Sequence, residues 1–192
     1  MYIAAAFLAW LGASLVVLAD GRRGLALGLA LLTAGLAVLA WPSGAWLGSS
    51  AVGGGGLIAS WQCGRSGPAT WGIMPAGSTA RLVLCVGSGL LALWIAASVT
   101  NGPGAPLRFA VLVLVVLMGA RILGDREAAV LLTSVAGLAL VLAVAPGLAA
   151  TSQGFIPAMA GGLVAAGVMF LPSGRAQPVS PGRAAHADKD GA

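Results

Sequence analysis

The chain has 192 residues, of which 59% are hydrophobic and only 8% are charged. Soluble globular proteins carry about 25% charged residues, so this composition excludes an ordinary soluble domain. It predicts instead an all-α bundle of transmembrane helices. The net charge of +5 does not indicate nucleic-acid binding, because the basic residues lie at segment ends and in the C-terminal region, where orientation in a membrane explains them.

The first two apolar segments are expected to form a tight helical hairpin. Residues 2–19 are apolar from the start and lack a basic leader, so we interpret them as a retained span and not as a cleaved signal. The charged turn 20–23 follows, and residues 24–41 form the second predicted span. Trp41 and Pro42 close that span as an interfacial aromatic residue and a helix breaker.

The third segment, residues 43–61, is ambiguous because it contains four consecutive glycines. They are Gly53, Gly54, Gly55 and Gly56. Each glycine inside a helix costs about 1 kcal/mol relative to alanine. The segment is therefore either a weak third span or a broken, re-entrant helix that the rest of the protein would have to shelter. The first alternative gives about seven spans in the chain and the second gives six.

Four further apolar segments complete the predicted bundle. After a polar loop that begins at Gln62, the predicted spans are residues 80–99, 107–120, 128–145 and 155–171. Several apolar runs in the chain reach about 18 residues, enough at about 1.5 Å per residue to cross most of a bilayer core of roughly 30 Å. From residue 172 the chain is rich in Pro, Gly, Ala and charge, which predicts a bundle over residues 1–171 and a disordered cytoplasmic tail over residues 172–192.

The basic residues favour seven spans and fix their direction. If the third segment crosses and the N-terminus is outside, nine of the ten Lys and Arg residues lie on the cytoplasmic side and only Arg108 lies outside. If it does not cross, the better orientation gives seven against three. The positive-inside bias therefore predicts an external N-terminus and an internal C-terminus. The Ala, Gly, Leu and Val content suggests a bacterial plasma membrane.

One cluster of opposite charges lies between two long apolar segments. It consists of Arg121, Asp125, Arg126 and Glu127. In a helix, Arg121 and Asp125 would form an i, i+4 ion pair that stabilises by a few tenths of a kcal/mol. We interpret the cluster first as a turn that fixes orientation. The alternative is a docking site for a cytoplasmic partner or for an anionic lipid headgroup.

The sequence contains no convergent set of residues for catalysis, a metal or a cofactor. All five acidic residues fall at span ends or in the tail, which disfavours a proton-translocating core. The only histidine is His186, in the predicted tail, and Cys63 and Cys85 lack the spacing of metal ligands. Ser49 has no histidine or lysine base in another span, and the four glycines are not followed by the Lys-Ser/Thr of a phosphate-binding loop. We therefore expect no cofactor and lean away from an enzyme.

Small side chains recur every four residues on several predicted spans, which lets helix backbones approach closely. These stripes are Ser88, Ala92, Ala96 and Thr100; Ala158, Gly162 and Ala166; and Gly24 with Gly28. Packing within the bundle is the first interpretation of the stripes. Contact with other membrane-protein subunits, or self-association, is the second.

The absence of a site and the small-residue stripes predict a non-catalytic accessory or structural subunit of a membrane complex or transporter. The alternative is a standalone transporter or permease for a neutral or apolar solute. That alternative is supported by the glycine-rich segment and by a weak internal repeat, in which Asp20 and Asp125 follow the first and fifth spans.

Overall fold

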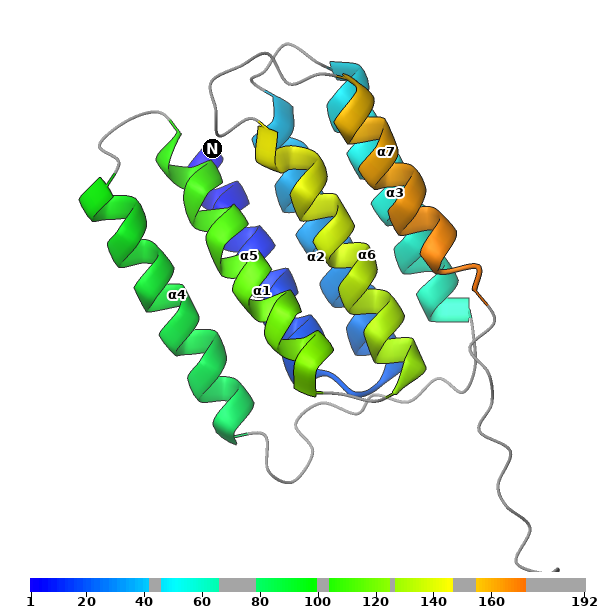
Figure 1. Ribbon diagram of the computed structural model, residues 1–192, viewed down its shortest axis with the longest axis horizontal. Coiled ribbons are helices and arrows are strands. Elements are labelled where there is room, and N and C mark those ends of the chain that lie inside the picture. Colours follow the sequence, from blue (N-terminus) through cyan, green and yellow to red (C-terminus); the bar gives the residue numbers. More distant parts are fainter. Residues whose placement is uncertain (42–45, 66–78, 100–103, 125–126, 147–154, 172–192) are drawn as a thin grey trace, which may run out of the picture.

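Seven helices run alternately up and down between the two ends of the molecule in this computed structural model (Figure 1). The structure describes residues 1–41, 46–65, 79–99, 104–124, 127–146 and 155–171, and these ranges contain no strand. The helices are α1 (Tyr2–Leu18), α2 (Arg22–Ala40), α3 (Trp46–Arg65), α4 (Thr79–Val99), α5 (Ala105–Gly124), α6 (Ala128–Val144) and α7 (Phe155–Val168). The all-helical class is therefore confirmed, whereas the predicted tail 172–192 lies outside the described residues.

Two helices end later than the segments predicted for them. The last turn of α3 continues through residues 62–65, which were expected to begin a loop, and α5 continues to Gly124 through Arg121, which was expected to lie in a turn. Both extensions place an arginine in the last turn of a helix. A positive charge there is stabilised by the helix dipole, and arginine is a good helix former.

The four glycines lie inside an uninterrupted helix, so the broken form of the third segment is not what the structure shows. A Cβ at Gly55 would lie 2.5 Å from the carbonyl oxygen of Gly162 on α7, and a Cβ at Gly56 would collide with Thr33 on α2. Two of the glycines are thus needed for close contact with neighbouring helices. Their packing offsets the low helix propensity of the segment.

The helices form two layers of three, with α4 at one edge. In one layer α2 lies between α1 and α3, and in the other α6 lies between α5 and α7 (Figure 1). Each helix faces its counterpart, α1 on α5, α2 on α6 and α3 on α7, and because the chain direction alternates, facing helices run in parallel. Since α3 finishes at the end of the bundle opposite to the start of α5, α4 is needed to return the chain.

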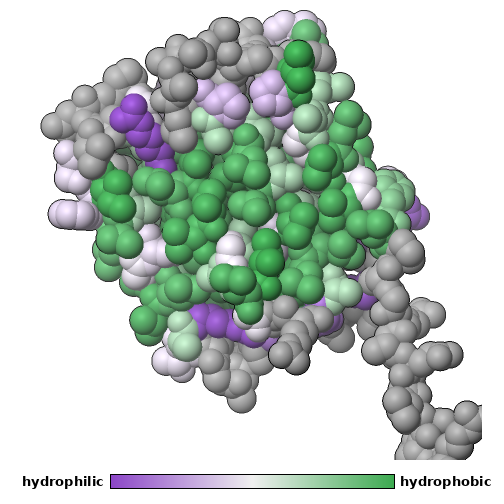
Figure 2. Space-filling view, viewed as in Figure 1, coloured by the Kyte–Doolittle hydropathy of each residue, from purple (hydrophilic) through white to green (hydrophobic). Residues whose placement is uncertain are grey.

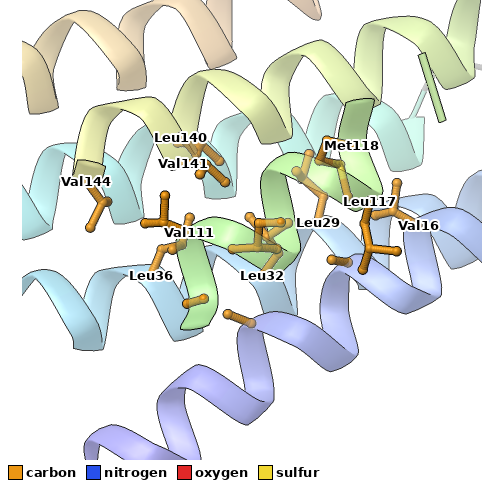
Figure 3. Packing of buried hydrophobic residues seen from close by; sticks show 14 of the residues in the cluster. Val16, Leu29, Leu32, Leu36, Val111, Leu117, Met118, Leu140, Val141 and Val144 are labelled. Atoms are coloured by element: carbon orange, nitrogen blue, oxygen red, sulfur yellow. The ribbon is translucent and has the colours of Figure 1, made fainter. Parts of the chain in front are cut away.

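Large aliphatic side chains fill the space between the layers (Figure 3). The labelled members of this group are Val16, Leu29, Leu32, Leu36, Val111, Leu117, Met118, Leu140, Val141 and Val144, all of them buried. Between α1 and α2 the contact is closer, because a Cβ at Gly35 would lie 2.6 Å from the carbonyl oxygen of Ala5 and one at Gly28 would lie 2.8 Å from that of Gly12. Glycine at these positions lets the two backbones touch.

The outer surface is largely apolar around the middle of the bundle. Figure 2 shows a broad hydrophobic band on one face, with hydrophilic residues towards the helix ends. Exposed large hydrophobic residues occur on all seven helices. Among the described helices, α2 and α5 are long and apolar enough to cross a membrane. Four more apolar stretches are shorter, namely Tyr2–Leu18, Thr79–Ile95, Ala128–Val144 and Ile156–Val168.

Candidate functional site

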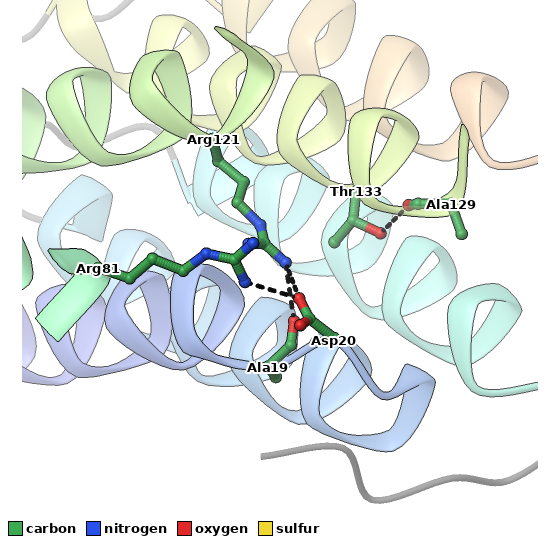
Figure 4. Close-up of polar contacts among 6 residues, drawn as sticks. All are labelled: Ala19, Asp20, Arg81, Arg121, Ala129 and Thr133. Atoms are coloured by element: carbon green, nitrogen blue, oxygen red, sulfur yellow. Dashed lines mark hydrogen bonds and ion pairs between the residues drawn. The ribbon is translucent and has the colours of Figure 1, made fainter. Parts of the chain in front are cut away.

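A carboxylate that joins several helices in the described part of the chain is that of Asp20, in the turn between α1 and α2. One of its carboxylate oxygens, Oδ1, accepts hydrogen bonds from Nη2 of Arg121 at 2.6 Å and from Nη1 of Arg81 at 2.8 Å (Figure 4). The same Nη2 atom of Arg121 also donates to the carbonyl oxygen of Ala19 at 3.1 Å. We call Asp20, Arg81 and Arg121 the carboxylate clasp.

The alternating direction of the helices brings the three clasp residues together. Asp20 follows the end of α1, Arg81 lies in the first turn of α4, and Arg121 lies in the last turn of α5. All three positions are at the same end of the bundle (Figures 1 and 4). The side chain of Arg121 is only 2% exposed, whereas those of Arg81 and Asp20 are 31% and 34% exposed.

The environment of Asp20 keeps its carboxyl group ionised. Burial by itself raises the pKa of Asp20, but hydrogen bonds from Arg121 and Arg81 and the positive charges of both guanidinium groups outweigh it, so that the pKa lies below its ordinary value. A carboxylate held in this way is a poor proton carrier near neutral pH. It is well suited to compensate the buried charge of Arg121, which would be very unfavourable alone.

The clasp also ties the edge helix α4 to the rest of the bundle. Farther along α4, the indole nitrogen of Trp10 donates a hydrogen bond to the carbonyl oxygen of Cys85 at 3.3 Å. A Cβ at Gly89 would lie 2.8 Å from the same indole nitrogen, so the ring lies directly on the α4 backbone. The geometry is therefore that of a structural joint between α1, α4 and α5.

The predicted charged cluster is only partly described. Arg121 is buried in the clasp and does not offer its guanidinium group to a docking partner, and Glu127 is exposed at the start of α6 without a side-chain capping hydrogen bond. Asp125 and Arg126 lie outside the described residues. The structure pairs Arg121 with Asp20, which is distant in the sequence. Neither Asp20 nor Arg81 was predicted as a site residue.

The other buried hydroxyl groups mostly bond within their own helices. Thr33 donates to the carbonyl oxygen of Leu29 at 2.7 Å, and Thr133 donates to that of Ala129 at 2.8 Å (Figure 4). Cys63, whose sulfur lies 3.7 Å from the hydroxyl oxygen of Thr133, is a free cysteine. The described residues include no group of three or more His, Cys, Asp or Glu side chains that could hold a metal ion.

Comparisons with known proteins give no match: no family model, curated protein or solved structure resembles the chain at a significant level. Function is therefore inferred from the geometry of the chain itself.

Proposed function

We propose that the chain is a polytopic membrane protein in which all seven helices cross the bilayer. The observation that carries this proposal is the distribution of polarity on the surface. Large apolar side chains are exposed on every helix, and the described arginines lie within four residues of a helix end. In water such a surface would drive aggregation, whereas a bilayer solvates it. Exposed tryptophans near helix ends, Trp41, Trp46 and Trp61, suit the two interfaces.

The orientation follows from the arginines. Five of the described arginines, Arg22, Arg23, Arg65, Arg81 and Arg121, lie at one end of the bundle, and Arg108 lies at the other. The positive-inside bias assigns the first end to the cytoplasm of a bacterial cell and the N-terminus to the outside. Two of the shorter helices, α1 and α6, have 17 residues each, which is about the minimum for a span, and α7 has 14.

Within the membrane, we infer a non-catalytic accessory or structural role in a larger complex. The interior supports this, because large aliphatic side chains fill the space between the two layers where a transporter would need a polar cavity. The hydroxyl groups of Thr33 and Thr133 bond to their own helices and do not converge on a substrate site. The carboxylate clasp lies at one end and is occupied by its own partners.

The outward face of α3 fits a partner helix. Ser50 and Gly54 are exposed there one turn apart, and no described atom lies within 4 Å of a Cβ built at Gly54. A glycine in an exposed helix costs about 1 kcal/mol relative to alanine. No internal contact requires it at this position, in contrast to Gly55 and Gly56. A small-residue pair of this kind allows a second membrane helix to approach closely.

A standalone transporter or permease for a neutral or apolar solute is the second candidate. It is favoured by the parallel stacking of α1–α3 on α5–α7, because many transporters are built from two repeats. The repeat of Asp20 and Asp125 would relate α1 to α5, which face each other. This candidate requires that the packed layers separate to form a path.

The test is purification of the tagged protein from its native membrane in mild detergent, followed by mass spectrometry of co-purifying proteins. We expect stoichiometric membrane partners for the native chain and their loss from the Gly54→Leu variant. Gly87→Leu is the matched control, because Gly87 is also an exposed helical glycine with no described atom within 4 Å of an added Cβ. A monomer or homo-oligomer without other subunits would contradict the subunit role and favour the transporter.

A further inference from the structure

The first turn of α2 and the last turn of α3 meet at one corner of the arginine-bearing end. The sulfur of Cys63 lies 4.0 Å from the carbonyl oxygen of Arg22. Since Arg22 and Arg23 begin α2 and Arg65 ends α3, this contact brings three arginines to the same corner. We call Arg22, Arg23, Arg65 and the neighbouring Trp61 the arginine corner.

The three charges of the arginine corner repel one another, and two of them, Arg22 and Arg23, also lie at an unfavourable helix end. The N-terminus of an α-helix carries a partial positive charge and favours acidic side chains in its first turn. In α2 that turn contains no acid and begins with two arginines, and the N-cap residue Gly21 supplies no side-chain hydrogen bond. The adjacent carboxylate of Asp20 is held by Arg81 and Arg121. A negative group at this corner would therefore be stabilised by several positive charges.

The aromatic member of the corner indicates the depth at which such a group would lie. Trp61 is 62% exposed, and the guanidinium carbon of Arg65 lies 4.6 Å from the centre of its ring. Tryptophan prefers the headgroup level of a bilayer, so a stacked guanidinium lies near the lipid phosphates. One turn towards the middle of α3, Leu57 and Ile58 are exposed and apolar. The surface thus combines cations at headgroup depth with an apolar strip beneath them.

We propose that the arginine corner binds the phosphate of an anionic phospholipid in the cytoplasmic leaflet, with an acyl chain lying along Leu57 and Ile58. The inference rests on the proposed membrane location. It differs from the docking site expected at Arg121, because the corner presents Arg23 and Arg65 on the surface whereas Arg121 is buried. Juxtamembrane arginines attract anionic lipids in proportion to their number.

The experiment is native mass spectrometry of the delipidated full chain, titrated with phosphatidylglycerol or with phosphatidylcholine. We expect the native chain to bind phosphatidylglycerol in preference to phosphatidylcholine. A variant that combines Arg22→Gln, Arg23→Gln and Arg65→Gln should bind phosphatidylglycerol more weakly, by about fivefold for each arginine removed. Arg108→Gln, at the other end of the bundle, is the matched control and should bind like the native chain. A variant with lysine at the same three positions keeps the charge and should retain most of the preference.

Equal binding of the two lipids by the native chain would overturn the inference, and so would unchanged phosphatidylglycerol binding by the glutamine variant. Displacement of the lipid by millimolar inorganic phosphate would also overturn it, because it would indicate a site for free anions. Alkaline carbonate extraction separates this inference from the proposed membrane location. If the native chain resists extraction while lipid selectivity is absent, only the lipid inference fails. If the native chain is extracted, the membrane proposal itself fails.

Discussion

At the scale of single residues, the carboxylate of Asp20 joins the ends of three helices. The substitution Asp20→Asn removes the negative charge that compensates the buried guanidinium of Arg121. Breaking a buried ion pair from one side costs about 3–5 kcal/mol, and we expect the lower end of that range because Asp20 is one-third exposed. Thermal or denaturant unfolding of the purified protein in detergent measures the loss.

The control for this prediction removes both charges. Combining Asp20→Asn with Arg121→Met replaces the buried cation by an apolar side chain of similar length, and it should recover part of the lost stability. Arg81→Gln should lower the stability less than Asp20→Asn does. The side chain of Arg81 is 31% exposed, so water can take its place as a hydrogen-bond donor to Asp20. If Asp20→Asn is as stable as the native chain, the clasp does not hold the bundle together.

The clasp also predicts how stability changes with pH. The pKa of Asp20 is lower in the folded protein than its ordinary value of about 3.9. Its contribution to stability is therefore complete above about pH 4 and is lost as the pH falls through the lower folded value. Melting temperatures measured between pH 6 and pH 3 should fall more steeply for the native chain than for Asp20→Asn. Parallel curves would show that another group causes the acid sensitivity.

The sequence could not reveal the clasp, because its partners are far apart in the chain. Within the charged turn, Asp125 is the expected partner of Arg121, since the two are about one helical turn apart. A signal was nevertheless present: Ile122 and Leu123 follow Arg121, so the apolar character continues past it, and a charge inside an apolar segment needs a counter-ion. Choosing Asp20 as that counter-ion requires the tertiary arrangement of α1 and α5.

At the scale of helices, the four glycines of α3 differ in their surroundings, which predicts opposite effects of alanine. Gly55→Ala would place a Cβ 2.5 Å from the carbonyl oxygen of Gly162, so α3 and α7 must separate. We expect a loss of about 1–3 kcal/mol. Gly54→Ala meets no described atom and should raise stability by up to about 1 kcal/mol through helix propensity.

Unfolding of the two alanine variants in the same detergent measures this difference. Equal stability of the Gly54→Ala and Gly55→Ala variants would contradict the close packing of α3 on α7. Gly162→Ala tests the same contact from α7 and should resemble Gly55→Ala, because a Cβ at Gly162 would lie 2.6 Å from the carbonyl oxygen of Ala51.

The positions of the helices could largely be predicted from sequence, whereas their contacts could not. Long apolar segments separated by Pro, Gly and charge define six of the helices to within a few residues. The third is ambiguous from sequence because helix propensity alone disfavours four glycines, and the compensating contacts of Gly55 and Gly56 come from α7 and α2. The stripes predicted on the second and seventh segments do lie at helix contacts, through Gly28 and Gly162.

At the scale of the whole molecule, the two layers and the edge helix follow from chain direction. Three antiparallel helices end opposite to where they began, so a second set that runs parallel to the first requires one additional crossing. That crossing is α4, which joins the bundle through α5 and α1. Together with the apolar surface on every helix, the even alternation of the seven helices supports the proposal that each of them crosses the bilayer.

Cysteine labelling in intact cells tests this central claim most directly. In a background with Cys63→Ala and Cys85→Ala, single cysteines are introduced as Tyr2→Cys and Glu127→Cys, at opposite ends of the bundle and both exposed. With seven spans and an external N-terminus, a membrane-impermeant maleimide should label Tyr2→Cys in intact cells and Glu127→Cys only after permeabilisation. Labelling of Glu127→Cys in intact cells would contradict the account, because it would mean that α3 does not cross or that the orientation is reversed.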